Sequence, residues 1–225
     1  MSRELLDAVV IETEGAPLAS VIWLHGLGAD GHDFPPIVPA LGVPKQARVR
    51  FVFPHAPMRP VTINGGMTMR AWYDIKSMDL ERHVEQEHLE ASREQVEAWI
   101  AHERELGIPS ERIVLAGFSQ GGAIVLYAGL QFGERLGGIL ALSCYHPMAE
   151  LIETRAADAN RRVPIFMAHG TRDPVVPIHL AEATIESLRE SGYEPEWHAY
   201  PMPHSVAPEE VKDIARWLLP LVASV

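Results

Sequence analysis

Short apolar runs of strand length alternate with helical patterns along most of this chain. The runs are rich in β-branched and aliphatic residues and show little polar alternation, which is typical of strands covered on both faces. The alternation predicts an α/β fold with a mostly parallel central sheet and helices on both faces, and residues 5–13 are expected to add an antiparallel edge strand. The predicted parallel strands cover 20–24, 48–53, 112–118, 138–143, 163–169 and 196–200.

Two amphipathic helices are predicted in the second half of the chain. Apolar residues recur at three- and four-residue spacing over 178–188, before Gly192, and again over 211–221, after Pro208. Glycine after a helix and proline in its first turn are common boundary signals. Residues 58–80 fit neither the helical nor the strand period, so an irregular excursion is expected there.

Composition and charge exclude several classes of function. The 225 residues are 47% hydrophobic and contain no low-complexity break, so a single domain over 1–225 is expected. A net charge of −11 repels a phosphate backbone and argues against nucleic-acid binding. No apolar stretch reaches the roughly 18 residues of a membrane span, residues 1–10 lack a secretory pattern, and the single cysteine allows no intrachain disulfide. We therefore expect no integral membrane association and a cytoplasmic location.

The strongest local motif is Gly-Phe-Ser-Gln-Gly at 117–121. It lies between a predicted strand and a helical run, which places Ser119 on a sharp turn. Bulky residues beside such a serine would clash, which explains the flanking glycines. The bare pattern arises by chance in roughly one chain in a dozen of this length. Its position between strand and helix therefore predicts a nucleophilic serine more strongly than its letters do.

A serine nucleophile needs a histidine base and a carboxylate that orients the histidine, in the chain order Ser, Asp, His on this type of turn. Asp173 and His204 each lie just after a predicted strand, and His204 is the one histidine after Asp173 in such a place. His169 precedes the acid on its own strand and is set aside. Open α/β sheets build their sites at the carboxyl ends of strands. Ser119, Asp173 and His204 are therefore the predicted triad.

Acyl transfer also needs hydrogen-bond donors for the developing oxyanion. The backbone N–H of Gln120 should supply one, and that of Leu27, in the glycine-rich loop after the first parallel strand, the other. The same loop, 26–31, matches the dinucleotide pattern G-x-G-x-x-G. Prolines follow it closely and the next strand ends without an acidic residue, which argues against dinucleotide binding.

Metal and thiol chemistry receive no comparable support. The sequence has no H-E-x-x-H, and the histidine and glutamate residues over 81–88 lack a ligand spacing, so a solvated charged face is expected there. Cys144 is expected to act as a small buried apolar residue and not as a nucleophile. We therefore expect no metal and no cofactor.

Together, the motifs resemble the phospholipase/carboxylesterase family of small α/β-hydrolases, which includes acyl-protein thioesterases and lysophospholipases. The resemblance implies an α/β-hydrolase fold and a serine hydrolase without a cofactor, in which Ser119, Asp173 and His204 form the triad. It also implies that residues 72–80 border an acyl channel. It spans nearly the whole chain and rests on the segments at 25–28, 53–57, 70–74, 117–122, 169–173 and 204–205.

The substrate pocket is the least specified part of the site. Met67, Met69 and Trp72 could line a site for an apolar substrate or equally pack in the core. Where the family usually has Ser-Gly-Tyr-Leu-Pro, this chain has Ser-Cys-Tyr-His-Pro at 143–147. This departure from the family pattern predicts a larger, more polar pocket wall, in which Cys144 and Tyr145 are candidate substrate-binding residues.

We thus expect a hydrolase that cleaves carboxylic esters or thioesters through an acyl-enzyme on Ser119, with a small-molecule ester or an acylated molecule as substrate. A carboxylesterase is the main hypothesis, and an acyl-protein thioesterase or lysophospholipase is the alternative. A non-catalytic binding protein of the same fold is a remote alternative, because such proteins usually lose a triad residue. A homodimer is an open possibility.

Overall fold

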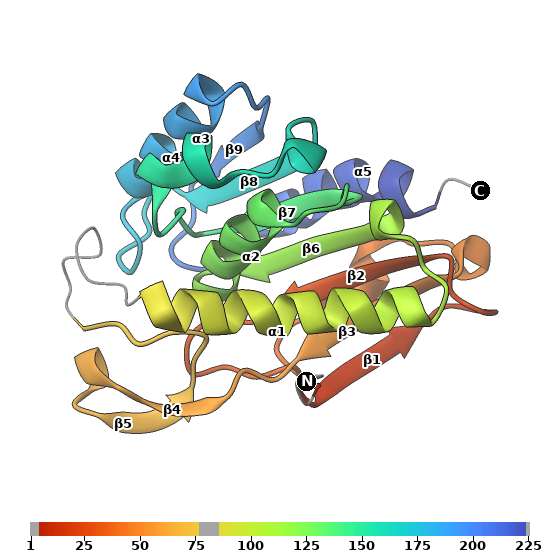
Figure 1. Ribbon diagram of the computed structural model, residues 1–225, viewed down its shortest axis with the longest axis horizontal. Helices are drawn as coiled ribbons and strands as arrows, with labels where there is room; N and C mark the ends of the chain where they lie inside the picture. The colour runs from red at the N-terminus through yellow and green to blue at the C-terminus, as the bar shows by residue number, and fades with distance from the viewer. Residues whose placement is uncertain (1–4, 77–85, 224–225) are drawn as a thin grey trace.

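A seven-stranded sheet forms the centre of the computed structural model, which describes residues 5–76 and 86–223 (Figure 1). Its strands are β1 (Ala8–Glu12), β2 (Ala19–Leu24), β3 (Val49–Pro54), β6 (Ile113–Phe118), β7 (Gly138–Leu142), β8 (Ile165–Gly170) and β9 (Glu196–Tyr200). They lie in the order β1-β3-β2-β6-β7-β8-β9, and β1 pairs antiparallel with β3 while the other pairings are parallel. The predicted α/β fold and its antiparallel edge strand are confirmed.

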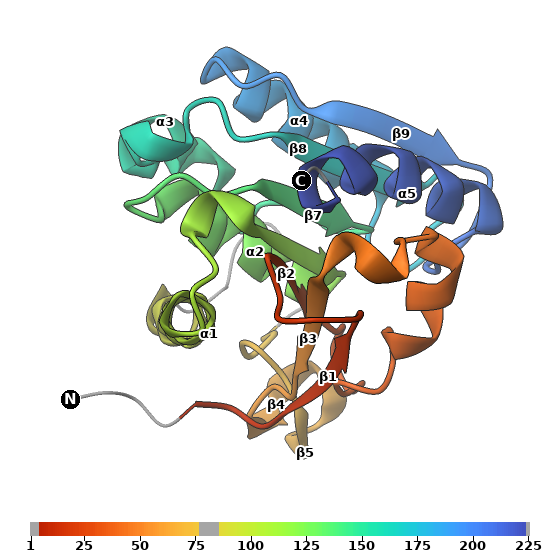
Figure 2. The ribbon, with the colours of Figure 1, turned by 90° about the vertical axis from the view of Figure 1, so that its right-hand side faces the viewer.

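Helices cover both faces of this sheet, as predicted. One face carries α1 (Gln86–Glu105), α2 (Gln120–Gln131), α3 (Ile152–Arg155) and α4 (Ile178–Glu190). The other carries α5 (Pro208–Val222) and the 3-10 helix η1 (Pro35–Leu41), which pack together on the right of Figure 2. Shorter 3-10 turns are η2 (Lys45–Ala47), η3 (Thr62–Asn64), η4 (Ser110–Arg112), η5 (Ala149–Leu151) and η6 (Asp158–Asn160).

Two apolar cores, one on each face of the sheet, hold these layers together. Within β2, Ile22 and Leu24 point into the core under α1 and α2, whereas Val21 and Trp23 point into the core under α5 and η1. Each of these side chains is at most 1% exposed. Burial of such a side chain contributes about 1.5–3 kcal/mol, which explains why the strands are continuous apolar runs without polar alternation.

The long helix α1 was not predicted from the sequence. Its buried face includes Leu89, Val96, Trp99 and Ile100, at helical spacing, but many charged residues are interspersed along the helix. It begins at Gln86, so most of the expected charged stretch at 81–88 lies outside the described residues.

The excursion expected over 58–80 is more regular than predicted. Residues Met58–Val61 and Met67–Arg70 form the antiparallel hairpin β4 and β5, a second sheet of two strands at the lower left of Figure 1. The expectation of an irregular segment was therefore wrong for these residues. Strand alternation is hard to recognise here because each strand has four residues and Pro60 interrupts one of them. Residues 77–80 lie outside the described residues.

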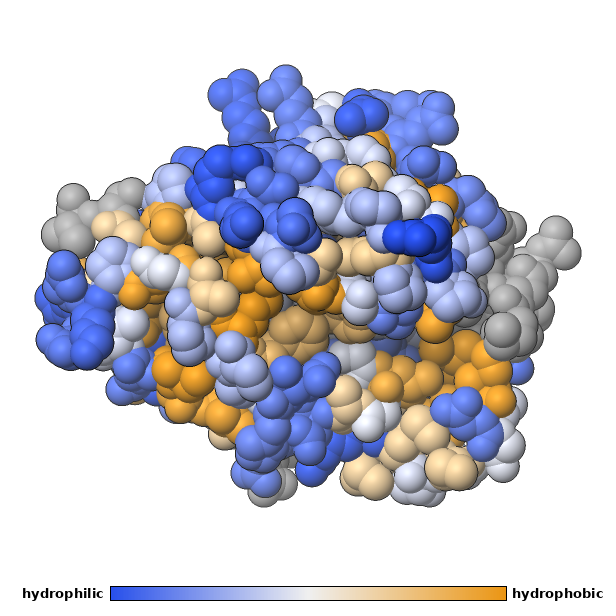
Figure 3. Space-filling view, turned by 180° about the vertical axis from the view of Figure 1, so that it is seen from behind, coloured by the Kyte–Doolittle hydropathy of each residue, from blue (hydrophilic) through white to orange (hydrophobic). Residues whose placement is uncertain are grey.

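The surface carries scattered apolar side chains. On the face shown in Figure 3, apolar residues gather in separate patches between hydrophilic ones. Large hydrophobic residues exposed within the described ranges include Met58 and Met67 on the hairpin and Val175 after β8. Among the described residues, no helix combines the length and the apolar character needed to span a bilayer.

Candidate active site

Ser119 occupies a strained turn between β6 and α2. Its φ of 53° and ψ of −120° lie in a region that residues with a Cβ rarely adopt. The flanking glycines permit the turn, because a Cβ on Gly117 would lie 2.5 Å from the backbone of Gly121, and one on Gly121 would lie 2.4 Å from the Leu24 carbonyl oxygen. Helix α2 begins at the next residue, so its free N–H groups point toward the serine.

The structure brings the three predicted triad residues together from three strand ends. The Ser119 hydroxyl lies 2.9 Å from Nε2 of His204, and Nδ1 of His204 lies 2.6 Å from Oδ2 of Asp173. With the proton on Nδ1, this imidazole donates to the carboxylate and accepts from the serine. The ring of Phe118 packs 4.8 Å from the His204 ring and helps fix its plane.

Asp173 is held by groups on both of its oxygens. Its side chain is fully buried, and Oδ1 accepts the backbone N–H groups of Val175 at 2.8 Å and Val176 at 2.9 Å. These two bonds leave Oδ2 directed at His204. These hydrogen bonds fix the orientation of the carboxylate toward the imidazole.

His169 is a neighbour of Asp173 that the sequence reasoning set aside. Its Nε2 lies 2.8 Å from the Val176 carbonyl oxygen and 3.4 Å from Oδ2 of Asp173. Both neighbours are acceptors, so Nε2 carries the proton. Burial lowers the pKa of His169, which keeps its imidazole neutral. The signal in the sequence was its position four residues before Asp173, across the end of β8.

The loop after β2 carries the expected oxyanion donor Leu27 and is anchored by His25. Nδ1 of this buried histidine donates to the Gly26 carbonyl at 2.7 Å, and Nε2 accepts the Ala56 N–H at 3.0 Å. Burial lowers the pKa of His25 to about 4, so the ring is neutral and both bonds persist at neutral pH. The Gly28 N–H also donates to the Arg70 carbonyl at 2.9 Å.

Trp72 and the side chain of Gln120 connect the two loops that carry the expected oxyanion donors. The indole N–H of Trp72 donates to the His25 carbonyl at 2.9 Å. The Gln120 amide accepts the Trp72 backbone N–H at 2.7 Å and donates to the Tyr73 carbonyl at 2.8 Å. Trp72 therefore holds the His25 loop and Gln120 in place through hydrogen bonds, a role that its sequence position alone does not indicate.

A cavity of about 370 Å³ opens beside Ser119. Both expected oxyanion residues border it, as do the two expected wall residues, Cys144 and Tyr145. Trp72, Met67 and Met69, also expected at this pocket, are not among its lining residues. The lining is mostly apolar and consists of Leu27, Ile63, Asn64, Tyr73, Ile75, Ser119, Gln120, Cys144, Tyr145 and Pro174 to Val176.

The competing chemistries find little support in this geometry. Burial raises the pKa of the Cys144 thiol, so it stays protonated and is a poor nucleophile. The G-x-G-x-x-G loop leads into η1, a 3-10 helix with Pro39 inside it, and no α-helix opens at its third glycine, which a dinucleotide site requires. The site can therefore activate a serine for attack on a carbonyl next to an apolar pocket.

Comparisons with known proteins agree with this chemistry. The Phospholipase/Carboxylesterase family matches residues 6–220. Acyl-protein thioesterase 1 of Gibberella zeae is 38% identical over 227 residues, covering 97% of both chains, and that of Neurospora crassa is 41% identical over 219 residues, covering 91% of this chain and 89% of its own.

Solved structures of similar proteins superpose on most of this chain and support the same fold. SOBER1 of Arabidopsis thaliana superposes with a TM-score of 0.84 at 31% identity, covering 90% of this chain and 98% of its own. Acyl-protein thioesterase 2 of Zea mays superposes with a TM-score of 0.82 at 26% identity, covering 96% and 99%. The chain is a serine hydrolase with an α/β-hydrolase fold, and it belongs to the phospholipase/carboxylesterase family.

Proposed function

We propose that this protein is an acyl thioesterase that removes acyl groups from acylated proteins through an acyl-enzyme on Ser119. The proposal rests on the hydrogen bonds that connect Asp173 through His204 to Ser119. Ser119 also borders an apolar cavity. The sequence alone favours a carboxylesterase. The relatives named acyl-protein thioesterase favour the alternative, at up to 41% identity.

The geometry supports a two-step reaction. His204 Nε2 takes the proton of Ser119 as its Oγ bonds to the acyl carbon, and Asp173 stabilises the resulting imidazolium. The amides of Leu27 and Gln120 are the proposed donors to the oxyanion. The tetrahedral intermediate then collapses, and His204 returns the proton to the departing sulfur or oxygen. A water molecule repeats the sequence on the acyl-enzyme, which frees the carboxylic acid and Ser119.

The thioesterase proposal is tested with two matched peptides that differ in one atom. One carries S-octanoyl cysteine and the other O-octanoyl serine, in the same flanking sequence. We expect a several-fold higher kcat/KM for the thioester, because a thiol is the better leaving group, and no turnover of either by Ser119→Ala. Hydrolysis of the oxygen ester alone would instead support the carboxylesterase hypothesis.

His169 is proposed as a positioning residue for Asp173. Its Nε2–H contacts both Oδ2 of Asp173 and the carbonyl of Val176, whose own N–H binds Oδ1 of Asp173. The imidazole therefore fixes the turn that orients the carboxylate. The same turn supplies the wall of the cavity from Pro174 to Val176.

Replacing His169 with leucine is expected to lower kcat by about 2- to 10-fold, since the lost hydrogen bond to the Val176 carbonyl is worth about 0.5–1.5 kcal/mol. His169→Gln, which restores an N–H near the position of Nε2, should recover most of the loss. Steady-state kinetics on a chromogenic octanoyl ester measures both variants. If both variants are equally slow, or leucine has no effect, His169 contributes packing only.

A further inference from the structure

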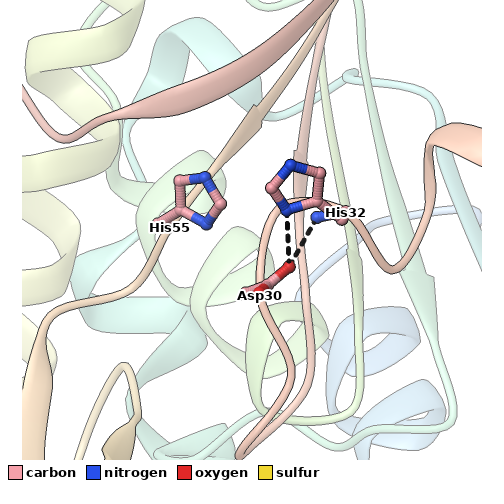
Figure 4. Close-up of side chains that lie close together, drawn as sticks. All are labelled: Asp30, His32 and His55. Atoms are coloured by element: carbon pink, nitrogen blue, oxygen red, sulfur yellow. Dashed lines mark hydrogen bonds and ion pairs between the residues drawn. The ribbon is translucent and has the colours of Figure 1, made fainter.

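A cluster of two imidazoles and one carboxylate lies where the loop after β2 meets the segment that follows β3. Asp30, His32 and His55 each present one potential ligand atom, and these three atoms lie within 4.8 Å of one another. Figure 4 shows both rings turned toward each other, with the Asp30 carboxylate beside them. The ring centroids are 5.3 Å apart. No other cluster of this kind occurs among residues 5–76 and 86–223.

The backbone that carries the cluster is fixed before any ion arrives. Gly31, between the two loop ligands, packs so closely on the end of β3 that a Cβ would lie 2.3 Å from the Phe53 carbonyl oxygen. Oδ1 of Asp30 accepts the backbone N–H of His32 at 2.7 Å. His55 is held from the other side, because its backbone N–H donates to the Asp7 carbonyl at 2.8 Å. Closing the ligands around an ion therefore needs side-chain rotation and little movement of the chain.

We propose that Asp30, His32 and His55 bind a borderline divalent transition-metal ion such as Zn²⁺, and that this ion stabilises the loop carrying Leu27. Two imidazoles and one carboxylate are a common zinc ligand set, with water in the fourth position. Ligand distances near 2.0–2.2 Å place such atoms roughly 3.3–3.6 Å apart, so separations of up to 4.8 Å must shorten by up to about 1.5 Å. The hard ions Mg²⁺ and Ca²⁺, which prefer oxygen ligands, fit it poorly.

The protonation states of the ligands favour this ion. The backbone N–H of His32 lowers the pKa of Asp30, which keeps the carboxylate ionised. Burial, followed by the charge of Arg70, lowers the pKa of His55, which leaves its imidazole neutral and able to act as a metal ligand. The charges of Asp30 and Asp7 act on His55 in the opposite direction to that of Arg70.

Metal binding would replace one hydrogen bond at Nδ1 of His32 and one at Nδ1 of His55 with a coordination bond at each atom. Nδ1 of His32 lies 3.1 Å from Oδ1 of Asp30, and its proton moves to Nε2 through water, since this side chain is 72% exposed. Nδ1 of His55 accepts the Gly31 N–H at 3.0 Å, and the ion competes for that lone pair. The competition makes the site weaker than a four-ligand structural zinc site.

Three variants and the metal alone test this site without measuring hydrolysis, so its failure and that of the proposed function are distinguishable. Calorimetric titration with ZnCl2 and thermal melts with and without ZnCl2 are made on wild type, His32→Ala, His179→Ala and His204→Gln. His32 and His179 are both exposed, so the pair is matched for loss of a surface imidazole. His204→Gln removes the other accessible imidazole near the loop.

We expect one bound Zn²⁺ per chain and a higher Tm in wild type, His179→Ala and His204→Gln. His32→Ala should weaken binding at least about tenfold, since loss of a residue that merely supports a metal ligand already costs about 10- to 100-fold. The same substitution should abolish the shift in Tm. Equal affinity in His32→Ala, loss of binding in His204→Gln, or binding that never saturates would overturn the proposal.

Discussion

Replacing Ser119 with alanine is expected to lower kcat/KM for every hydrolysed substrate by about 10⁴- to 10⁶-fold, the range found when a nucleophile of this type is removed. The hydroxyl lies 2.9 Å from Nε2 of His204, and in the described residues no other hydroxyl or thiol group is bonded to that nitrogen. The measurement is kcat/KM on a p-nitrophenyl ester and on an S-acyl peptide. The backbone strain at this position is unchanged by the substitution, so the protein should still fold.

Two further variants separate the roles within the triad. Asp173→Asn should lower the rate by up to about 10⁴-fold, because the amide favours the wrong tautomer of His204. Combining Asp173→Asn with Ser119→Ala should cost little more than Ser119→Ala alone, since residues that act as a unit are not additive. Wild-type rates in Ser119→Ala would remove this residue as the nucleophile. Additive losses in the double variant would contradict a triad that acts as one unit.

The sequence was most informative where local and long-range requirements coincide. The G-x-S-x-G turn predicted the position of Ser119 because only a glycine-flanked serine fits between β6 and α2. Asp173 and His204 were predictable since parallel strands place their carboxyl ends along one edge of the sheet. Each inference used a rule of topology together with a rule of chemistry.

Contacts between distant segments were not predictable from periodicity. Trp72 is a large aromatic residue of the kind that lines apolar pockets. Its indole N–H instead donates a hydrogen bond to the carbonyl of His25, 47 positions earlier in the chain. His169 was set aside because it precedes the acid on its own strand, and only the packing of the following turn shows its Nε2 facing Asp173. The pairing of His32 with His55 likewise depends on the approach of the loop to the end of β3.

The size of the cavity predicts a preference for medium-length acyl chains. Its volume of about 370 Å³ lies near the lower end of ligand pockets, which span about 300–1,000 Å³. Each methylene that enters an apolar pocket contributes about 0.8 kcal/mol, or about fourfold in kcat/KM, until the chain meets a wall. We expect kcat/KM on p-nitrophenyl esters to rise from acetyl to a maximum near octanoyl and to fall toward palmitoyl.

Tyr145 is the residue expected to limit the acyl chain. It lines the cavity and shares a hydrogen bond with Tyr73, which holds two large rings together in the wall. Tyr145→Ala should move the maximum to longer chains and raise kcat/KM for palmitoyl about tenfold or more, equivalent to two or more additional buried methylenes. Tyr145→Phe keeps the volume and removes only the hydroxyl, so its maximum should stay at octanoyl. A wild-type maximum at acetyl would show that the chain does not enter this cavity, whereas an unshifted profile in Tyr145→Ala would show that another residue forms its end.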